Sequence, residues 1–186
     1  MADKKKLEQA ARLILEAIGE DPNREGLVET PRRFAEMMEE QMAYTTVSNE
    51  ESARQFGKTF TSSDEGPVVV KDISIFSHCE HHLALMYHMH VSVGYIPSGR
   101  VIGLSKVARI ADAVSRRLQI QERIGADIRT IIEKVTGSPD VIVRIDGEHS
   151  CMTARGIKKP GAVTTTISSS GKFNTPEYRQ LFKEML

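Results

Sequence analysis

The sequence predicts an α+β protein in which an antiparallel four-stranded sheet carries two helices on one face, preceded by a helical appendage. From residue 67 onward, strand patterns occur in two pairs, and two helix patterns lie between the pairs. Strand pairs that flank a helix pair are typical of an antiparallel sheet with its helices on one side. Before residue 67, helical periodicity dominates.

The N-terminal region, residues 1–66, is predicted to hold two helices and a connection. Apolar residues recur at helical spacing over residues 7–18, and Gly19 offers a stop. Thr30-Pro31 predicts an N-cap followed by proline in the first turn of a second helix. The stretch 45–66 is polar and is interpreted as a connection.

The following region, residues 67–186, supplies the predicted sheet. Strands are predicted over 68–76, 86–96, 141–145 and 163–170, and helices over 104–118, 121–135 and from 175 onward. Pro97-Ser98-Gly99 and Gly137-Ser138-Pro139 mark breaks between these elements. The domain boundary is therefore placed between residues 66 and 67.

Composition narrows the functional classes. The 186 residues carry 25 basic and 25 acidic side chains, so bulk charge argues against a nucleic acid or a membrane surface as partner. No apolar run approaches the ~20 residues of a membrane span, and the basic start is not followed by the apolar core of a secretory signal. Two cysteines without an export signal suit a reducing cytoplasm, so a cytoplasmic location is expected.

Both cysteines stand beside histidine, in Cys79-Glu80-His81-His82 and in His149-Ser150-Cys151. Taken singly, each residue is better explained as a small buried hydrophobe or a polar surface feature. Together they predict one metal site with Cys79, His82 and Cys151 as ligands. Three protein ligands leave one tetrahedral position open. This is the arrangement of catalytic zinc, which lowers the pKa of a bound water to about 7.

Two further imidazoles are expected beside that metal. On a strand, residues two apart point to the same side, so His149 would lie beside the metal if Cys151 binds it. His81 is adjacent to the ligand His82. Imidazoles with a pKa near neutrality suit proton transfer, although a strand-end histidine with satisfied hydrogen bonds explains His149 as well.

A group of cations points to an anionic substrate. Ser105 is a plausible N-cap, and Lys106 and Arg109 would share one face of the first helical turns, where free N–H groups favour anions. Alone, this pattern is better explained as an ordinary solvated helix start. Arg155 and Arg33 add further cations, and their concentration in a chain of zero net charge suggests a polyphosphate.

Gln121-Glu122 begins the second predicted helix of the sheet region. The Glu122 carboxylate is either a charge favoured by the helix dipole or an acceptor for a planar edge of N–H and NH₂ groups, as guanine presents. The residues alone do not choose between these interpretations.

Several motifs resemble the GTP cyclohydrolase I family, over a stretch from about Ala11 to the C-terminus. The matching segments are Thr30-Pro31-x-Arg33, Ser77-x-Cys79-Glu80-His81-His82, Gly94-Tyr95-Ile96-Pro97, Gly103-Leu104-Ser105-Lys106-x-Ala108-Arg109-Ile110, Gln121-Glu122-Arg123 and His149-x-Cys151-Met152-x-x-Arg155-Gly156. The resemblance implies the tunnelling fold for a catalytic domain at 67–186, in which small antiparallel sheets of several subunits join into a barrel. It also implies a homodecamer with active sites at subunit interfaces.

The resemblance further implies a role for each matching residue. Cys79, His82 and Cys151 would bind one zinc per subunit, and His81 and His149 would transfer protons. Ser105, near the ribose, would be a further catalytic residue. Substrate contacts would come from Gln121 and Glu122 to guanine, and from Lys106, Arg109, Arg155 and Arg33 to the triphosphate. The implied reaction opens the guanine imidazole ring of GTP by hydrolysis, releases C8 as formate, and rearranges the rest to 7,8-dihydroneopterin triphosphate.

Other functional classes stay open at this point. Residues 84–90 depart from the family pattern, because they are one residue longer and lack its proline and glycine, which suggests a non-catalytic nucleotide- or pterin-binding member of the same fold. A structural zinc domain would need a fourth ligand, for which His78, His88 and His90 are available. His88 and His90, two apart on a predicted strand, also offer a second metal site.

Overall fold

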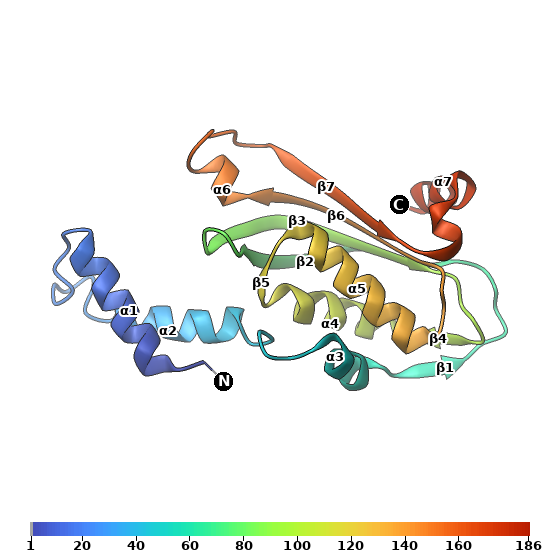
Figure 1. Cartoon of the computed structure of the whole chain (residues 1–186), viewed down its shortest axis with the longest axis horizontal. Helices are drawn as coiled ribbons and strands as arrows, with labels where there is room; N and C mark the ends of the chain where they lie inside the picture. The colour runs from blue at the N-terminus through green and yellow to red at the C-terminus, as the bar shows by residue number, and fades with distance from the viewer. Residues whose placement is uncertain (1) are drawn as a thin grey trace. The chain divides into compact units, whose positions relative to one another are not determined.

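A computed structural model describes residues 2–186, which form two compact units that divide after Thr45. The first unit is a helical hairpin in which α1 (Lys4–Ala17) packs against α2 (Thr30–Gln41) (Figure 1). Both predicted helices are confirmed. The predicted Thr30 N-cap is wrong, because Thr30 is already helical and the N-cap is Glu29, which makes no side-chain capping bond.

The second unit is built on a mixed sheet with strand order β5-β2-β3-β6-β7, and a short β1-β4 pair lies beside it (Figure 1). Its strands are β1 (Thr59–Thr61), β2 (Val68–Cys79), β3 (Ala84–Tyr95), β4 (Arg100–Ile102), β5 (Leu118–Gln119), β6 (Val141–His149) and β7 (Val163–Ser169). Its helices are α3 (Asn49–Phe56), α4 (Leu104–Ser115), α5 (Gln121–Thr136), α6 (Ser150–Thr153), the 3-10 turn η1 (Gly171–Asn174) and α7 (Pro176–Met185). The predicted antiparallel arrangement of β2, β3, β6 and β7 is confirmed, and β5 makes the sheet mixed by pairing parallel to β2.

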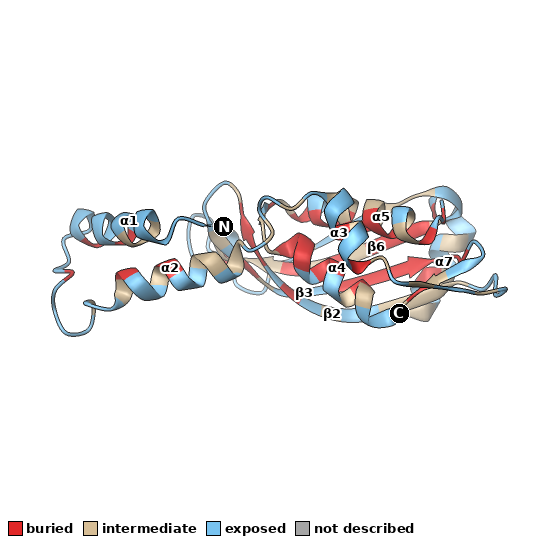
Figure 2. Ribbon diagram, turned by 90° about the horizontal axis from the view of Figure 1, so that it is seen from below, coloured by how far each residue is buried: buried red, intermediate tan, exposed pale blue. Residues whose placement is uncertain are grey.

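The main core lies between this sheet and the helices α4 and α5. As predicted, both helices cover one face, with α4 over β2 and α5 over β6 and β7 (Figure 1). Figure 2 shows the buried residues concentrated along this interface. Val93 pairs with Val143 and Val91 with Ile145 across β3 and β6, and all four are fully buried. Burying each such side chain is worth roughly 1.5–3 kcal/mol, so the core fixes the strand register.

The opposite face of the sheet is covered at one end by α7. Ile142 points away from its buried neighbours on β6, because successive strand residues alternate in direction, and it packs with Ile96, Phe173 and Phe182. A Cβ atom at Gly94 would lie 2.9 Å from the Phe182 ring. Glycine at that position therefore lets α7 approach the sheet closely.

The stretch 45–66 is more than a connection, which corrects the sequence-based interpretation. It contains α3 and β1, and α3 begins with a capping box in which the side chains of Ser48 and Glu51 each bind the other's backbone N–H. Asn49 joins α3 to α5 by a 2.9 Å hydrogen bond to Asp127. The compact units thus divide upstream of this segment, while the start of a catalytic part at residue 67 stays a prediction.

No helix within residues 2–186 combines the length and the apolar character that crossing a membrane requires.

Candidate metal centre and active site

The candidate metal centre forms where β2 and β6 end. Cys79 is the last residue of β2, His82 lies in the turn after it, and Cys151 lies in α6. The ligand atoms of these three residues all lie within 4.8 Å of one another, and no other trio of Cys, His, Asp or Glu in residues 2–186 meets this criterion. Both cysteines are free thiols. The predicted metal-ligand set therefore comes together in one chain.

Cys151 reaches the site by a different route from the one predicted. The expectation that His149 and Cys151 share one side of a strand is wrong, because β6 ends at His149 and the chain turns into α6 at Ser150. The helical turn still directs both side chains into one cavity. His149 at the end of β6 and Cys151 in α6 therefore face the same cavity, although they do not lie on one strand.

The turn that carries His82 is held against the first turn of α5. The Glu80 backbone N–H donates to Gln119 O at 3.0 Å, and the Glu80 carboxylate accepts two hydrogen bonds from Arg123, at 2.6 and 3.2 Å. Leu83 closes the turn with φ of 52°, in the left-handed region that a leucine rarely adopts. Glu80 and Arg123 thus position the metal-ligand turn, a role that the residue pattern alone did not predict.

His81 and His82 lie differently relative to the thiols. His81 Nδ1 is 3.6 Å from Cys79 Sγ, and His82 Nδ1 is 3.9 Å from it, yet only His82 belongs to the trio that includes Cys151. The Arg155 guanidinium donates to His82 Nε2 at 2.7 Å, so in this geometry the neutral ring carries its proton on Nδ1, the nitrogen that faces the thiol. Binding a metal through Nδ1 therefore requires that proton to leave and Arg155 to release Nε2. His81 is exposed beside the trio.

Gln121 fixes the orientation of His149. Its side chain is 1% exposed, and its amide nitrogen donates to Ile145 O at 3.0 Å and to Thr164 O at 2.9 Å. Because carbonyls only accept, this nitrogen is assigned and the amide oxygen must face His149 Nε2, 2.8 Å away. His149 therefore carries a proton on Nε2, and Nδ1 is its basic nitrogen in the neutral form.

A glycine on β6 allows this arrangement. A Cβ atom at Gly147 would lie 2.9 Å from Met89 Cγ and 3.2 Å from Gln121 Oε1. Any larger residue would push the Gln121 amide away from the strand. The Gln121 amide is thus held by protein contacts at the cavity wall, and its assignment to guanine stays a prediction.

The pKa of Cys151 is raised and the pKa of His149 is lowered, as expected for a cation site next to a neutral imidazole. Burial and then the adjacent Cys79 thiol raise the pKa of Cys151, because two neighbouring thiolates repel each other. A divalent cation removes this repulsion and stabilises both thiolates. Burial lowers the pKa of His149, with the Glu122 carboxylate acting in the opposite direction.

These residues line one cavity of about 200 Å³. Its lining includes Cys79, His81, His82, Met86, Gln119, Ile120, Gln121, Glu122, His149 and Cys151. The exposed Glu122 carboxylate sits in the first turn of α5 at the edge of the cavity. A thiol pair, three imidazoles and a carboxylate therefore surround one space.

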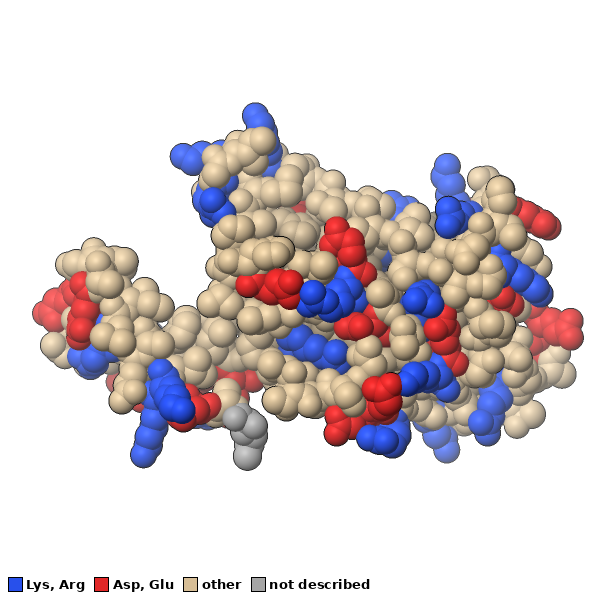
Figure 3. All heavy atoms as spheres, viewed as in Figure 1, with Lys and Arg blue, Asp and Glu red and all other residues tan. Residues whose placement is uncertain are grey.

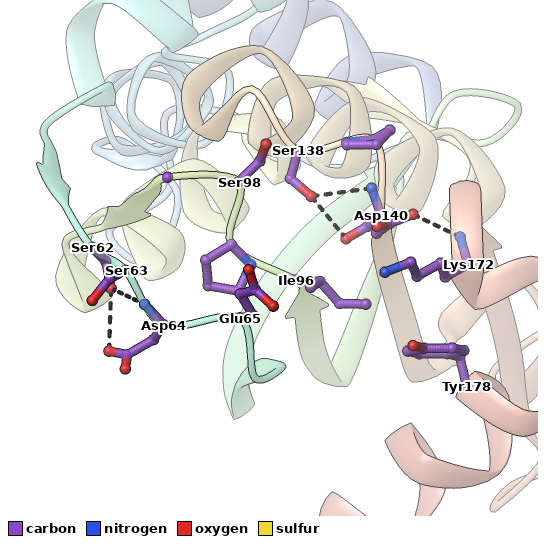
Figure 4. Close-up of a pocket in the computed structure, with 13 residues that line it drawn as sticks. Ser62, Ser63, Asp64, Glu65, Ile96, Ser98, Ser138, Asp140, Lys172 and Tyr178 are labelled. Atoms are coloured by element: carbon purple, nitrogen blue, oxygen red, sulfur yellow. Dashed lines mark hydrogen bonds between the residues drawn. The ribbon is translucent and has the colours of Figure 1, made fainter.

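A larger cavity, of about 610 Å³, lies among the loops that include Ser62, Ser98 and Asp140 (Figure 4). No cysteine or histidine lines it, and several of its polar groups pair with one another. Asp140 accepts a 2.7 Å hydrogen bond from Lys172 N, and Asp64 accepts one from Ser62 at 3.2 Å. Chemistry rather than size thus identifies the smaller cavity as the candidate site.

The predicted phosphate-binding residues lie in separate parts of the chain, some in the loop after α6 and others at the start of α4. Arg155 contacts His82, and with Lys158 and Lys159 it belongs to the exposed loop after α6, where Figure 3 shows basic side chains gathered. Lys106 and Arg109 lie in the first turns of α4, which starts beside Lys58, as the Gly103 N–H donates to Lys58 O at 3.1 Å.

The start of α4 lies away from the metal-ligand cavity. The end of α4 is the part near β2's last residues, because Ser77 Oγ donates to Ser115 O at 2.8 Å. Neither Lys106 nor Arg109 lines the cavity. The expected Ser105 N-cap is wrong: Gly103 is the N-cap and makes no side-chain capping bond, so Ser105 is free in the first turn.

Arg33 lies on α2 in the first unit, and its assignment to the triphosphate stays a prediction.

Fold and site together define an α+β protein with a Cys₂His metal-ligand trio that shares a cavity with two further imidazoles. The model of the family described as GTP cyclohydrolase I matches residues 7–186. The chain therefore belongs to the GTP cyclohydrolase I family.

Sequence relatives agree with this assignment. The chain is 58% identical over 180 residues to "GTP cyclohydrolase 1" of Clostridium acetobutylicum, covering 94% of this chain and 92% of that protein. It is 58% identical over 179 residues to the protein of the same name from Clostridium beijerinckii, covering 93% and 91%. A solved structure of an archaeosine synthase QueF-Like, in the apo form, aligns at 19% identity with a TM-score of 0.46, over 59% of this chain and 96% of that one.

Proposed function

We propose that this chain catalyses the GTP cyclohydrolase I reaction, converting GTP to 7,8-dihydroneopterin triphosphate and formate. The observation that carries the proposal is the single cavity in which the Cys79, His82 and Cys151 trio meets His81, His149 and Glu122. A chain that only binds a nucleotide has no need of two extra imidazoles beside a metal-ligand trio.

The donor set fits zinc, one ion per subunit. Two thiolates and one imidazole are ligands that zinc prefers, and their mutual distances allow one ion to bind all three. Zinc held by Cys79, His82 and Cys151 would supply an activated water for attack on C8 of guanine.

The imidazoles handle protons in this proposal. Gln121 presents His149 with Nε2 protonated, so His149 Nδ1 is the atom that takes up or hands over a proton. His81 is the second proton carrier, exposed beside the trio. Between them they protonate N7 of guanine as the imidazole ring opens and C8 leaves as formate.

Substrate orientation comes from groups remote from C8. Glu122 accepts hydrogen bonds from the guanine N–H and NH₂ edge, with Gln121 beside it, and Gln121 also orients His149. Arg155 binds the triphosphate from the same chain, and Arg33 adds a further cation. Lys106 and Arg109 bind it, with Ser105 near the ribose, from a neighbouring copy, because the start of α4 lies away from the cavity of its own chain.

Binding of the triphosphate by Lys106 and Arg109 of a neighbouring copy requires an oligomer with active sites at subunit interfaces. Within residues 2–186, β7 is an edge strand of the sheet, and it exposes Val163 and Ile167. Such an edge suits continuation of the sheet into another copy. This edge supports the tunnelling fold, and membership of the family supports a homodecamer. We propose that this assembly acts on GTP in the cytoplasm, without a nucleic acid or a membrane.

The deciding experiment measures formate released from GTP, together with the zinc content of the same sample. Formate in step with a fluorescent pterin, in zinc-loaded protein only, is the expected result. Tight GTP binding with no formate between about pH 6 and 9, where an imidazole titrates, would contradict the proposal and favour the non-catalytic binding module.

A further inference from the structure

The segment of β3 that departs from the family pattern contains an irregularity in the strand. Tyr87 pairs with Glu148 on β6, and the next pair joins His90 to Asp146, so His88 and Met89 on β3 face the single residue Gly147. His88 has φ of 47°, which costs free energy in a residue other than glycine. Strand bulges often re-aim side chains beside functional sites.

The bulge directs two side chains towards the end of β6 and α6. The Tyr87 hydroxyl lies 2.9 Å from Thr153 Oγ1 and donates to Glu148 at a longer 3.4 Å. His88 Nδ1 lies 3.0 Å from the other Glu148 oxygen. A hydroxyl has one proton to donate, so Thr153 donates to Tyr87 and Tyr87 to Glu148. We call Tyr87, His88, Glu148 and Thr153 the β3 brace.

The brace holds a segment that has little else to hold it. Within the described residues 150–162, Thr153 is the buried one, at 9% exposure, and the others are half-buried or exposed. A four-residue helix is not stable by itself, because helix formation needs more turns or tertiary contacts. The Tyr87–Thr153 hydrogen bond is therefore a principal anchor of α6.

Glu148 joins the members of the brace. One carboxylate oxygen accepts from the Tyr87 hydroxyl at 3.4 Å, and the other lies 3.0 Å from His88 Nδ1. The brace thus contacts the α6 segment at Thr153. Cys151, the third metal ligand, lies two residues before Thr153 in the same helical turn.

We propose that Tyr87 and Glu148 are positioning residues that hold Cys151 in the geometry of the metal centre. This inference rests on the proposed zinc site. It gives the atypical segment a role in support of the ligand set rather than in substrate binding, since neither Tyr87 nor His88 lines the cavity.

The test compares zinc affinity in Tyr87→Phe, Thr153→Val and the double variant, measured on the full chain by competition with a chelator. Loss of outer-shell support typically weakens metal binding about 10- to 100-fold. Because both single changes remove the same hydrogen bond, the double variant should bind zinc no more weakly than the weaker single variant. Tyr178→Phe, which removes the hydroxyl of a tyrosine whose ring contacts Phe173 and Lys172, is the matched control and should bind zinc as the unchanged chain does.

A second readout separates positioning from general stability. Cobalt in place of zinc gives thiolate-to-metal absorption, which should weaken or shift in Tyr87→Phe and Glu148→Gln while the melting temperature of the metal-free protein stays constant. Equal zinc affinity and equal cobalt spectra in all variants would overturn the inference and leave the zinc site intact. An unchanged chain that binds no zinc would overturn the proposed metal centre and this inference with it.

Discussion

The two ends of the main sheet differ in how many of the predicted site residues they bring together within one chain. Where β2 and β6 end, the metal-ligand trio, two further imidazoles and Glu122 converge on one cavity. Where α4 begins, Lys106 and Arg109 stand away from that cavity. Metal ligands must lie within a few ångströms of one ion, whereas a triphosphate reaches well beyond the reacting ring. One chain therefore builds the metal end alone, and this difference supports the proposal that another copy supplies the anion end.

The largest effect is expected at the metal end. Cys151→Ala removes a ligand and should abolish zinc binding and lower kcat by on the order of 1,000-fold or more, because the zinc-supplied nucleophile is lost. Metal analysis and formate release measure the two effects on one sample. Met152→Leu alters the exposed neighbour in the same helical turn and should leave both unchanged. Full zinc content in Cys151→Ala would show that the trio is not the metal site.

A smaller effect of another kind is expected at the anion end. Lys106→Ala should raise KM for GTP by about 10- to 100-fold, the size of a lost hydrogen bond to a charged group. Zinc content should not change, because Lys106 lies outside the cavity. The matched control is Lys183→Ala, which removes a lysine from α7. Loss of zinc in Lys106→Ala would contradict the separation of the two ends.

Mixing the two variants tests directly whether neighbouring copies share a site. If each site takes its metal end from one copy and its anion end from another, random mixed oligomers of Cys151→Ala and Lys106→Ala contain about a quarter of intact sites. Formate release at low GTP should then recover to that level after unfolding and reassembly together. Activity that stays at the average of the two separate variants would place both ends in one chain.

The same contrast explains how much could be predicted from the sequence. Cys79, His82 and Cys151 were identifiable because thiols are scarce in this chain and each stands beside histidine. Hydrophobic periodicity located the main strands and helices, because the core is continuous between α4, α5 and the sheet. The scarcity of thiols and the hydrophobic periodicity depend only on residue type and local spacing, so both can be read from the sequence alone.

The rest depended on contacts that leave little trace in the sequence. The polar composition of the segment 45–66 masks α3, although Ser48 and Glu51 have the spacing of a capping box, which marks a helix start. β5 pairs over two residues only, too short for a periodic pattern. The Gln121–His149 bond and the β3 brace join residues that are 28 or more positions apart, which spacing rules do not reach.

The smallest expected effect concerns the pair that holds the ligand turn. The hydrogen bond from Arg123 lowers the pKa of Glu80, so this pair stabilises the fold above the ordinary glutamate pKa and loses its effect as pH falls through the lowered value. Arg123→Ala should therefore reduce the melting temperature slightly at pH 7 and not at strongly acid pH.

The matched control is Arg116→Ala, which removes a partly exposed arginine at the end of α4 that pairs with Asp112. Both should cost little stability, as surface pairs do, but only Arg123→Ala should also weaken zinc binding, because Glu80 lies in the ligand turn. If the melting temperature of Arg123→Ala were lowered by the same amount at acid pH, loss of the Glu80–Arg123 pair would not be the cause.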